Sequence, residues 1–467
     1  MTELQWLTGS EIGAAYAARR LSPVELVRAL LREIEAHNPD CGAFIHVDAE
    51  GALETARRAE TDIFAGRSLG PLHGIPLGAK DNIDIAGVAT TCHSKILLDN
   101  IAPHDAPAIA NLRAAGAIML GKQSLHEFAF GGPSKELPFP FARHPWNTDY
   151  HPGGSSSGSG VALAAGFVPL SLGTDAGGSI RNPAGNCGVV GLKPTYDLVS
   201  RRGVFPVAFT LDHVGPMARS VADVALFLDG LVGSNTEGRF GADLERGVRG
   251  LRIGFVRQWH ETDMVADPEV MAALDEVERV LRQEGAEVRN IALPRLQELA
   301  AVQRIILLAE TWAVHAKWLR ERPQDYSTPC RRKVLPGAFL SAGDYVQAQQ
   351  WRGRMIDAVD DAFRTSTCCS PRAAWIRRSG STMERASRKP IPARAAAPSI
   401  SPGIQRLRCR AAFRRRQGCH YRYSSSDALM TRSRCCGSLR PTSGSPNGAI
   451  VARARCTAAV PNANVSP

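Results

Sequence analysis

The 467-residue sequence lacks an apolar run long enough to cross a membrane. Its longest apolar stretch, residues 161–172, is interrupted by Gly166, Pro169 and Ser171 and falls short of the ~20 residues that a spanning helix needs. The N-terminus also lacks the basic and apolar segments of a secretory signal. These absences predict a soluble, cytoplasmic protein without a membrane partner, long enough for one elaborated α/β domain or for two domains.

Clustered cysteine is absent from residues 1–364. The cysteines of this main body are scattered, as is usual for reduced thiols, and none has the spacing of a metal site: Cys41, Cys92, Cys187 and Cys330. No metal and no other cofactor is predicted.

Acidic residues are nearly absent from residues 365–467. This tail holds 19 Lys and Arg against Glu384 and Asp427, a net charge of +17. The main body holds 37 basic and 43 acidic residues, a net charge of −6. The overall charge of +11 therefore comes from the tail, and no nucleic-acid partner is predicted for the main body.

Residues 1–73 carry helical signals and are predicted to form an N-terminal helical cover. Ser22 followed by Pro23 is typical of an N-cap with proline in the first turn. The predicted helices span residues 11–19, 24–37 and 48–65.

Short apolar runs separated by helical stretches begin at Gly74 and indicate an α/β sheet. Strands are predicted over residues 75–79, 117–120, 168–173 and 251–256, and helices over residues 268–284, 296–320 and 342–363. Residues 74–233 are the predicted catalytic core. Residues 234–364 are predicted to shape the substrate pocket of the same domain.

Two clusters of glycine and serine, residues 153–160 and 173–183, enclose a helix and a buried strand at fixed spacing, which is unlike a flexible linker. The second cluster follows the strand, and its consecutive backbone N–H groups can point into one concavity. An oxyanion hole is predicted there, with Ser179 as the attacking hydroxyl. Its donors are the amides of Ala176, Gly177, Gly178 and Ser179. Asp175 and Arg181 are predicted to form a structural pair that braces this loop.

A serine nucleophile needs a base. His151 is the only histidine of the main body beside these clusters, and nothing in the sequence marks a carboxylate for it. Lys80 ends a buried strand, where lost hydration lowers the pKa of an amine by several units. Ser155 can then pass a proton between Lys80 and Ser179.

These residues resemble the amidase signature family throughout residues 153–184. The spacings agree as well, with 75 positions from Lys80 to Ser155 and 24 from Ser155 to Ser179. The resemblance extends over residues 8–364 and implies that Lys80 is the general base, Ser155 the bridging serine and Ser179 the nucleophile. It also implies a cis peptide beside the bridging serine, and a mixed central sheet covered by helices on both faces.

The predicted activity is hydrolysis of a small-molecule carboxylic amide, of the linear type, through an acyl-enzyme. An alternative is a glutaminase that resembles the A-type polypeptide of glutamyl-tRNA amidotransferase and works with partner subunits. A homodimer also stays open.

The tail changes character abruptly after Arg364, and we interpret it as a shift of reading frame that leaves residues 365–467 disordered. Residues 365–370 are what codons for Asp-Val-Asp-Val-Leu-Leu give when they are read one base late. Under this hypothesis the C-terminal part of the sheet is missing or replaced, and an inactive remnant is a further alternative. A basic, disordered arm that binds RNA is the competing interpretation.

Overall fold

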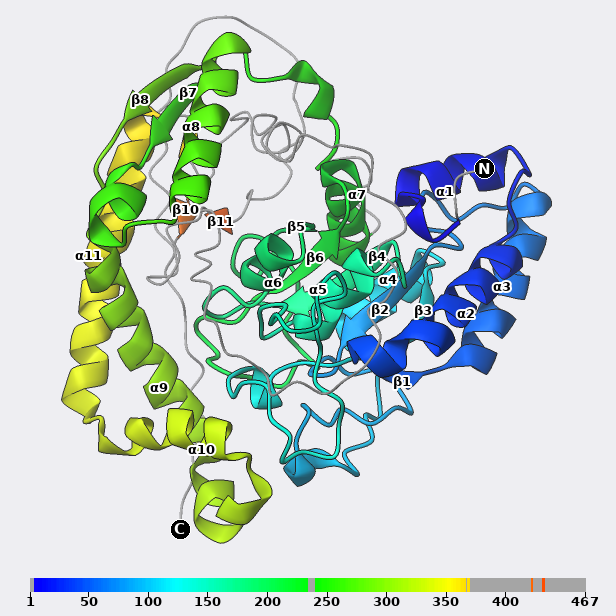
Figure 1. Ribbon diagram of the computed structural model, residues 1–467, viewed down its shortest axis with the longest axis horizontal. Helices are drawn as coiled ribbons and strands as arrows, with labels where there is room; N and C mark the ends of the chain where they lie inside the picture. The colour runs from blue at the N-terminus through cyan, green and yellow to red at the C-terminus, as the bar shows by residue number, and fades with distance from the viewer. Residues whose placement is uncertain (1–3, 234–239, 367, 370–420, 423–430, 433–467) are drawn as a thin grey trace, which may run out of the picture.

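The computed structural model describes residues 4–233, 240–366, 368–369, 421–422 and 431–432 (Figure 1). Nearly all of the predicted frame-shifted tail lies outside these residues, so its disorder and its reading frame stay predictions.

A six-stranded mixed sheet forms the centre of the fold, with the strand order β1-β3-β2-β4-β6-β5. Strand β2 runs parallel to β3 and β4, whereas the other pairs are antiparallel. Every residue of β2, β3 and β4 is buried, because helices cover both faces of the sheet. The strands are β1 (Phe44–Val47), β2 (Pro76–Lys80), β3 (Ile118–Gln123), β4 (Leu170–Thr174), β5 (Val190–Gly191) and β6 (Val214–Ala218).

The helices around this sheet begin at the caps that their sequences favour. Ser22 accepts hydrogen bonds from the amides of Val24 and Glu25 at the start of α2, as predicted. Helix α1 begins earlier than predicted, because Thr8 and Glu11 form a capping box. These helices are α1 (Gly9–Ala17), α2 (Pro23–Cys41), α3 (Ala49–Phe64), α4 (Pro107–Ala114), α5 (Ser157–Ala164), α6 (Arg181–Asn186) and α7 (Val221–Val232).

The N-terminal segment differs from the predicted all-helical cover. Strand β1 lies between α2 and α3 and pairs antiparallel with β3, with Val47 opposite Gly121. Only four residues long, it is too short for its alternation of side chains to be distinguished from the flanking helices. The segment is therefore an integral part of the central sheet.

The predicted strand near residue 251 also lies elsewhere than expected. It is β7 (Arg252–Phe255), which joins β8 (Glu287–Asn290) and β9 (Cys368–Cys369) in a separate parallel sheet. The long helices α9 and α11 pack against each other beside it (Figure 1). The helices of this part are α8 (Pro268–Gln283), α9 (Leu296–Glu321), α10 (Thr328–Val334) and α11 (Ala342–Thr365).

Short elements complete the described chain. They are the 3-10 helices Leu4–Trp6, Lys95–Leu97, Glu127–Ala129, Leu244–Arg246, Pro323–Asp325 and Leu335–Phe339, the π-helix Trp259–Asp263, and the antiparallel pair β10 (Tyr421–Arg422) and β11 (Thr431–Arg432). None of the helices in the described ranges combines the length and apolar character needed to cross a bilayer.

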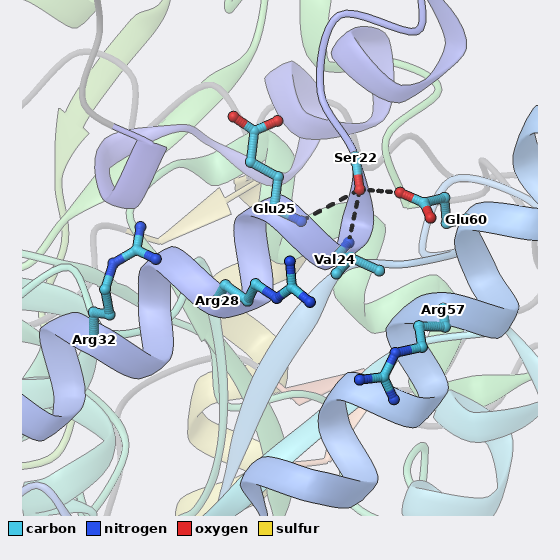
Figure 2. Close-up of a pocket in the computed structure, with 7 residues that line it drawn as sticks. All are labelled: Ser22, Val24, Glu25, Arg28, Arg32, Arg57 and Glu60. Atoms are coloured by element: carbon cyan, nitrogen blue, oxygen red, sulfur yellow. Dashed lines mark hydrogen bonds between the residues drawn. The ribbon is translucent and has the colours of Figure 1, made fainter.

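An open groove of about 600 Å³ lies between α2 and α3 (Figure 2). The guanidinium groups of Arg28 and Arg57 extend into it, and Glu60 accepts a hydrogen bond from Ser22 at its edge. None of the predicted site residues lines this groove. The candidate site is therefore elsewhere, at the ends of β2 and β4.

Candidate functional site

The structure brings Lys80 and Ser155 into direct contact. Lys80 is the last residue of β2 and is fully buried. Its Nζ donates hydrogen bonds to Ser155 Oγ at 2.7 Å and to Thr174 Oγ1 at 2.7 Å. The amine thus lies within proton-transfer distance of the predicted bridging serine.

Burial lowers the pKa of Lys80 to about 7, because the charged amine loses its hydration. The nearby carboxylates of Asp175 and Asp212 act in the opposite direction and raise it, but by less. Near neutral pH a large fraction of the Lys80 side chain is therefore the uncharged amine that a general base requires.

Thr174 and Asn82 complete the surroundings of the amine. Thr174 ends β4, the parallel neighbour of β2, and its Oγ1 also accepts a hydrogen bond of 3.2 Å from Asn82 Nδ2. The sequence prediction assigned no role to either residue. A polar residue at the carboxyl end of the buried strand beside β2 was the available signal for Thr174.

Ser155 lies in the loop before α5 and is buried. The peptide bond between Gly154 and Ser155 is cis, as the family resemblance implies. The amide of Gly154 donates to Asn182 Oδ1 at 2.9 Å, and the carbonyl of Ser155 accepts from the His126 amide at 3.1 Å. The backbone of this loop is therefore held on both sides of the serine.

Ser179 lies in the loop between β4 and α6 and is partly exposed. Its carbonyl accepts a hydrogen bond of 3.1 Å from the amide of Ser156, which ties the two serine loops together. Within the described part of the chain, its hydroxyl has no hydrogen bond to Ser155. The structure thus places the predicted nucleophile beside the Lys80–Ser155 pair without a direct bond to it.

Asp175 organises the loop that carries Ser179. Its two oxygens accept hydrogen bonds of 2.9 Å from Nε and a terminal nitrogen of Arg181, and Lys193 Nζ lies 3.5 Å away. Burial alone would raise the pKa of this carboxyl, but Arg181 and Lys193 hold it well below the usual range. Asp175 is therefore an anion that fixes the loop. Lys193 had no predicted role, because only the folded chain brings it here.

The amide of Gly178 does not match its prediction as an oxyanion donor. Gly178 has a φ of 114°, and its N–H donates to Asp175 Oδ1 at 2.7 Å. That donor is already used in holding the loop. The amides of Gly177 and Ser179 have no hydrogen-bond partner among the described residues, so they can receive a developing oxyanion.

Helix α9 covers the outside of this loop. Ala176 belongs to the same buried apolar cluster as Leu299 and Val302 of α9. The side-chain amide of Gln303 lies so close to Gly177 that a Cβ at position 177 would approach its Nε2 to 2.8 Å. Residues 234–364 therefore reach the site through α9.

A metal centre has no counterpart in the described ranges, which contain no group of three or more histidine, cysteine or acidic side chains suited to hold an ion.

Comparison with known proteins agrees with this geometry. The family model described as Amidase matches residues 25–374. The A-type polypeptide of the glutamyl-tRNA(Gln) amidotransferase of Roseiflexus sp. (strain RS-1) is 40% identical over 383 residues, which are 76% of this chain and 78% of that protein. The corresponding polypeptide of Carboxydothermus hydrogenoformans is 36% identical and covers 77% of this chain and 81% of its own.

Solved structures show the same relationship. The peptide amidase of Stenotrophomonas maltophilia superposes with a TM-score of 0.68 at 31% identity, covering 77% of this chain and 82% of its own. A structure described as a vestigial protein complex that reveals the origins of an s-triazine catabolic enzyme gives 0.75 at 33% identity, covering 87% and 89%. The chain therefore belongs to the amidase signature family.

Proposed function

We propose that the protein hydrolyses a carboxylic amide to an acid and ammonia or an amine, with Ser179 as nucleophile, Ser155 as bridging serine and Lys80 as general base. The hydrogen bond of 2.7 Å between Lys80 Nζ and Ser155 Oγ, in a buried place that lowers the pKa of the amine to about 7, carries this proposal.

The reaction begins when Ser179 Oγ attacks the amide carbonyl. Its proton passes to Ser155 Oγ while the Ser155 proton passes to the neutral Lys80 Nζ. The oxyanion meets the amides of Gly177 and Ser179. The Lys80 ammonium then returns a proton through Ser155 to the leaving nitrogen, and the C–N bond breaks.

The resulting acyl-enzyme is an ester of Ser179. Water attacks this ester and gives up a proton through the same relay, which releases the acid and restores the Ser179 hydroxyl. No step needs a cofactor.

A hydrolysis panel of linear aliphatic, aromatic and amino-acid amides tests the proposal, with Ser179→Ala as the inactive control. A fluorophosphonate probe should label Ser179 in the active protein. The same assays on the chain with its present sequence and on a chain with the frame restored after codon 364 separate an active enzyme from an inactive remnant. Absence of labelling in both chains contradicts the assignment.

A second candidate is a glutaminase that passes ammonia to partner subunits. The similarity to curated amidotransferase polypeptides of the A type favours it, since one of them is 40% identical to this chain. Glutamine hydrolysis that appears only when such a partner is added would support this candidate, whereas hydrolysis of simple amides by the isolated chain would support the first. Both candidates place the protein in the cytoplasm.

A further inference from the structure

Two histidines contact the loop that carries the bridging serine. His126 follows β3 and His151 precedes the glycine pair of the loop. Their Nε2 atoms lie 3.2 Å apart, and the Gly153 amide lies 2.9 Å from His151 Nδ1. The His126 ring packs directly on Gly154, where an added Cβ would meet its Cε1 at 2.1 Å.

The hydrogen bonds fix one arrangement of protons on this pair. The Gly153 amide can only donate, so His151 Nδ1 must carry a lone pair. His151 is then neutral with its proton on Nε2, and it donates to His126 Nε2. His126 in turn is neutral with its proton on Nδ1. The chain of donors therefore runs from Gly153 to His151 to His126.

A further proton breaks this chain at either ring. Protonation of His151 Nδ1 sets an N–H against the Gly153 N–H, and protonation of His126 Nε2 sets an N–H against that of His151. In both cases two donors face each other, and the loop loses a fixed contact immediately before Ser155.

The surroundings of the pair also oppose a positive charge. Burial lowers the pKa of His126 well below its usual range, and it lowers that of His151. The charged and titratable groups that face the pair come from several elements: Lys333 of α10, Lys80 of β2 and His93 of the loop after β2. Each of them disfavours protonation, and no carboxylate is among them.

We propose that His126 and His151 are positioning residues, a neutral imidazole pair that holds residues 153–155 so that Ser155 connects Lys80 with Ser179, and that uptake of one proton by the pair releases the loop and switches the enzyme off in acid. The proposal rests on the proposed function, because it assigns the pair to the Lys80–Ser155–Ser179 relay. Neither histidine touches the reacting atoms.

The test compares His151→Asn with His151→Leu across pH 5 to 8.5. Asparagine keeps an acceptor for the Gly153 amide but does not titrate, whereas leucine removes the acceptor. The rate of fluorophosphonate labelling of Ser179 is measured for both variants, for wild type and for the exposed control His104→Asn. The midpoint of thermal unfolding is measured for each to confirm folding.

We expect wild type and the control to lose labelling below pH 6 with a slope approaching two, one proton for Lys80 and one for the pair. His151→Asn should keep the rate at pH 8 within about threefold and show a slope of one. His151→Leu should be slower by about tenfold or more at every pH. A folded leucine variant with wild-type rates, or an asparagine variant that keeps the slope of two, overturns the proposal.

Failure of the proposed function would look different, because wild type itself would then not be labelled. In that case the pair is judged by nitrogen NMR of protein labelled with ¹⁵N-histidine at pH 8, with the variants assigning the resonances. The proposal expects a protonated Nε2 and an unprotonated Nδ1 on His151. A proton on Nδ1 overturns it.

Discussion

The ionisation of Lys80 should set the lower pH limit of activity. Burial moves the pKa of this amine from 10.5 to about 7. At pH 7 an unperturbed lysine would be neutral in roughly one molecule in 3,000, whereas about half of the molecules are neutral with the lowered value. The structure therefore supplies a gain of about 10³-fold in reactive enzyme, equivalent to about 5 kcal/mol.

The rate of amide hydrolysis, or of Ser179 labelling, measured between pH 6 and 9.5 checks this value. We expect the rate to rise about tenfold per unit toward pH 7 and to level off above pH 8. Lys80→Arg stays cationic at every accessible pH and should lose at least about 10³-fold. Lys317→Arg, on the exposed face of α9, is the matched control and should change nothing. A wild-type midpoint near pH 10 would refute the reasoning.

Three further predictions concern charges around the amine. Asp212→Asn removes a carboxylate that raises the pKa of Lys80, so the acid limit of the pH–rate profile should move to lower pH. Lys80→Met should flatten the rise in thermal stability between pH 7 and pH 9.5; the folded pKa lies below the unfolded one, so the cost of burying the charge is complete below pH 7 and fades as pH rises toward 10.5. Asp175→Asn leaves buried Arg181 and Lys193 without their anion and should lower the free energy of unfolding by about 3–5 kcal/mol, and Asp197→Asn at the exposed pair with Arg201 by less than about 1 kcal/mol. Denaturant titration measures both; equal losses would contradict the role of Asp175.

The sequence was most informative where local chemistry decides the structure. Ser22 with Pro23, and Asp267 with Pro268, start helices at the residues where they were expected, since capping depends on a few neighbouring atoms. The apolar runs that become β2, β3 and β4 were also predicted, with boundaries displaced by one to three residues.

The parts that depend on contacts between distant segments could not be predicted in the same way. The pairing of β1 with β3, and the separate sheet around β7, follow from which strands meet after folding. In the site, Lys80 and Ser155 were predicted together from motif spacing. Thr174 was not, because its contact with Lys80 joins residues 94 positions apart.

The amide of Gly178 shows the same limit within a single loop. A glycine-rich turn after a strand predicts several donors, but the sequence cannot tell which of them Asp175 will take. That choice depends on φ at Gly178 and on the position of the Asp175 oxygens, which only the folded loop defines.

Helix α9 separates two tasks that many active sites combine. The proton relay lies at the ends of β2 and β4, in the central sheet, whereas the side chain nearest the outside of Gly177 comes from Gln303 of a helix encoded more than 100 positions later. Substitutions at Gln303 can therefore alter what fits beside the loop while the lysine and its hydrogen bonds stay intact. For protein engineering, that helix is the place where selectivity can be varied first, with the chemistry left as a constant.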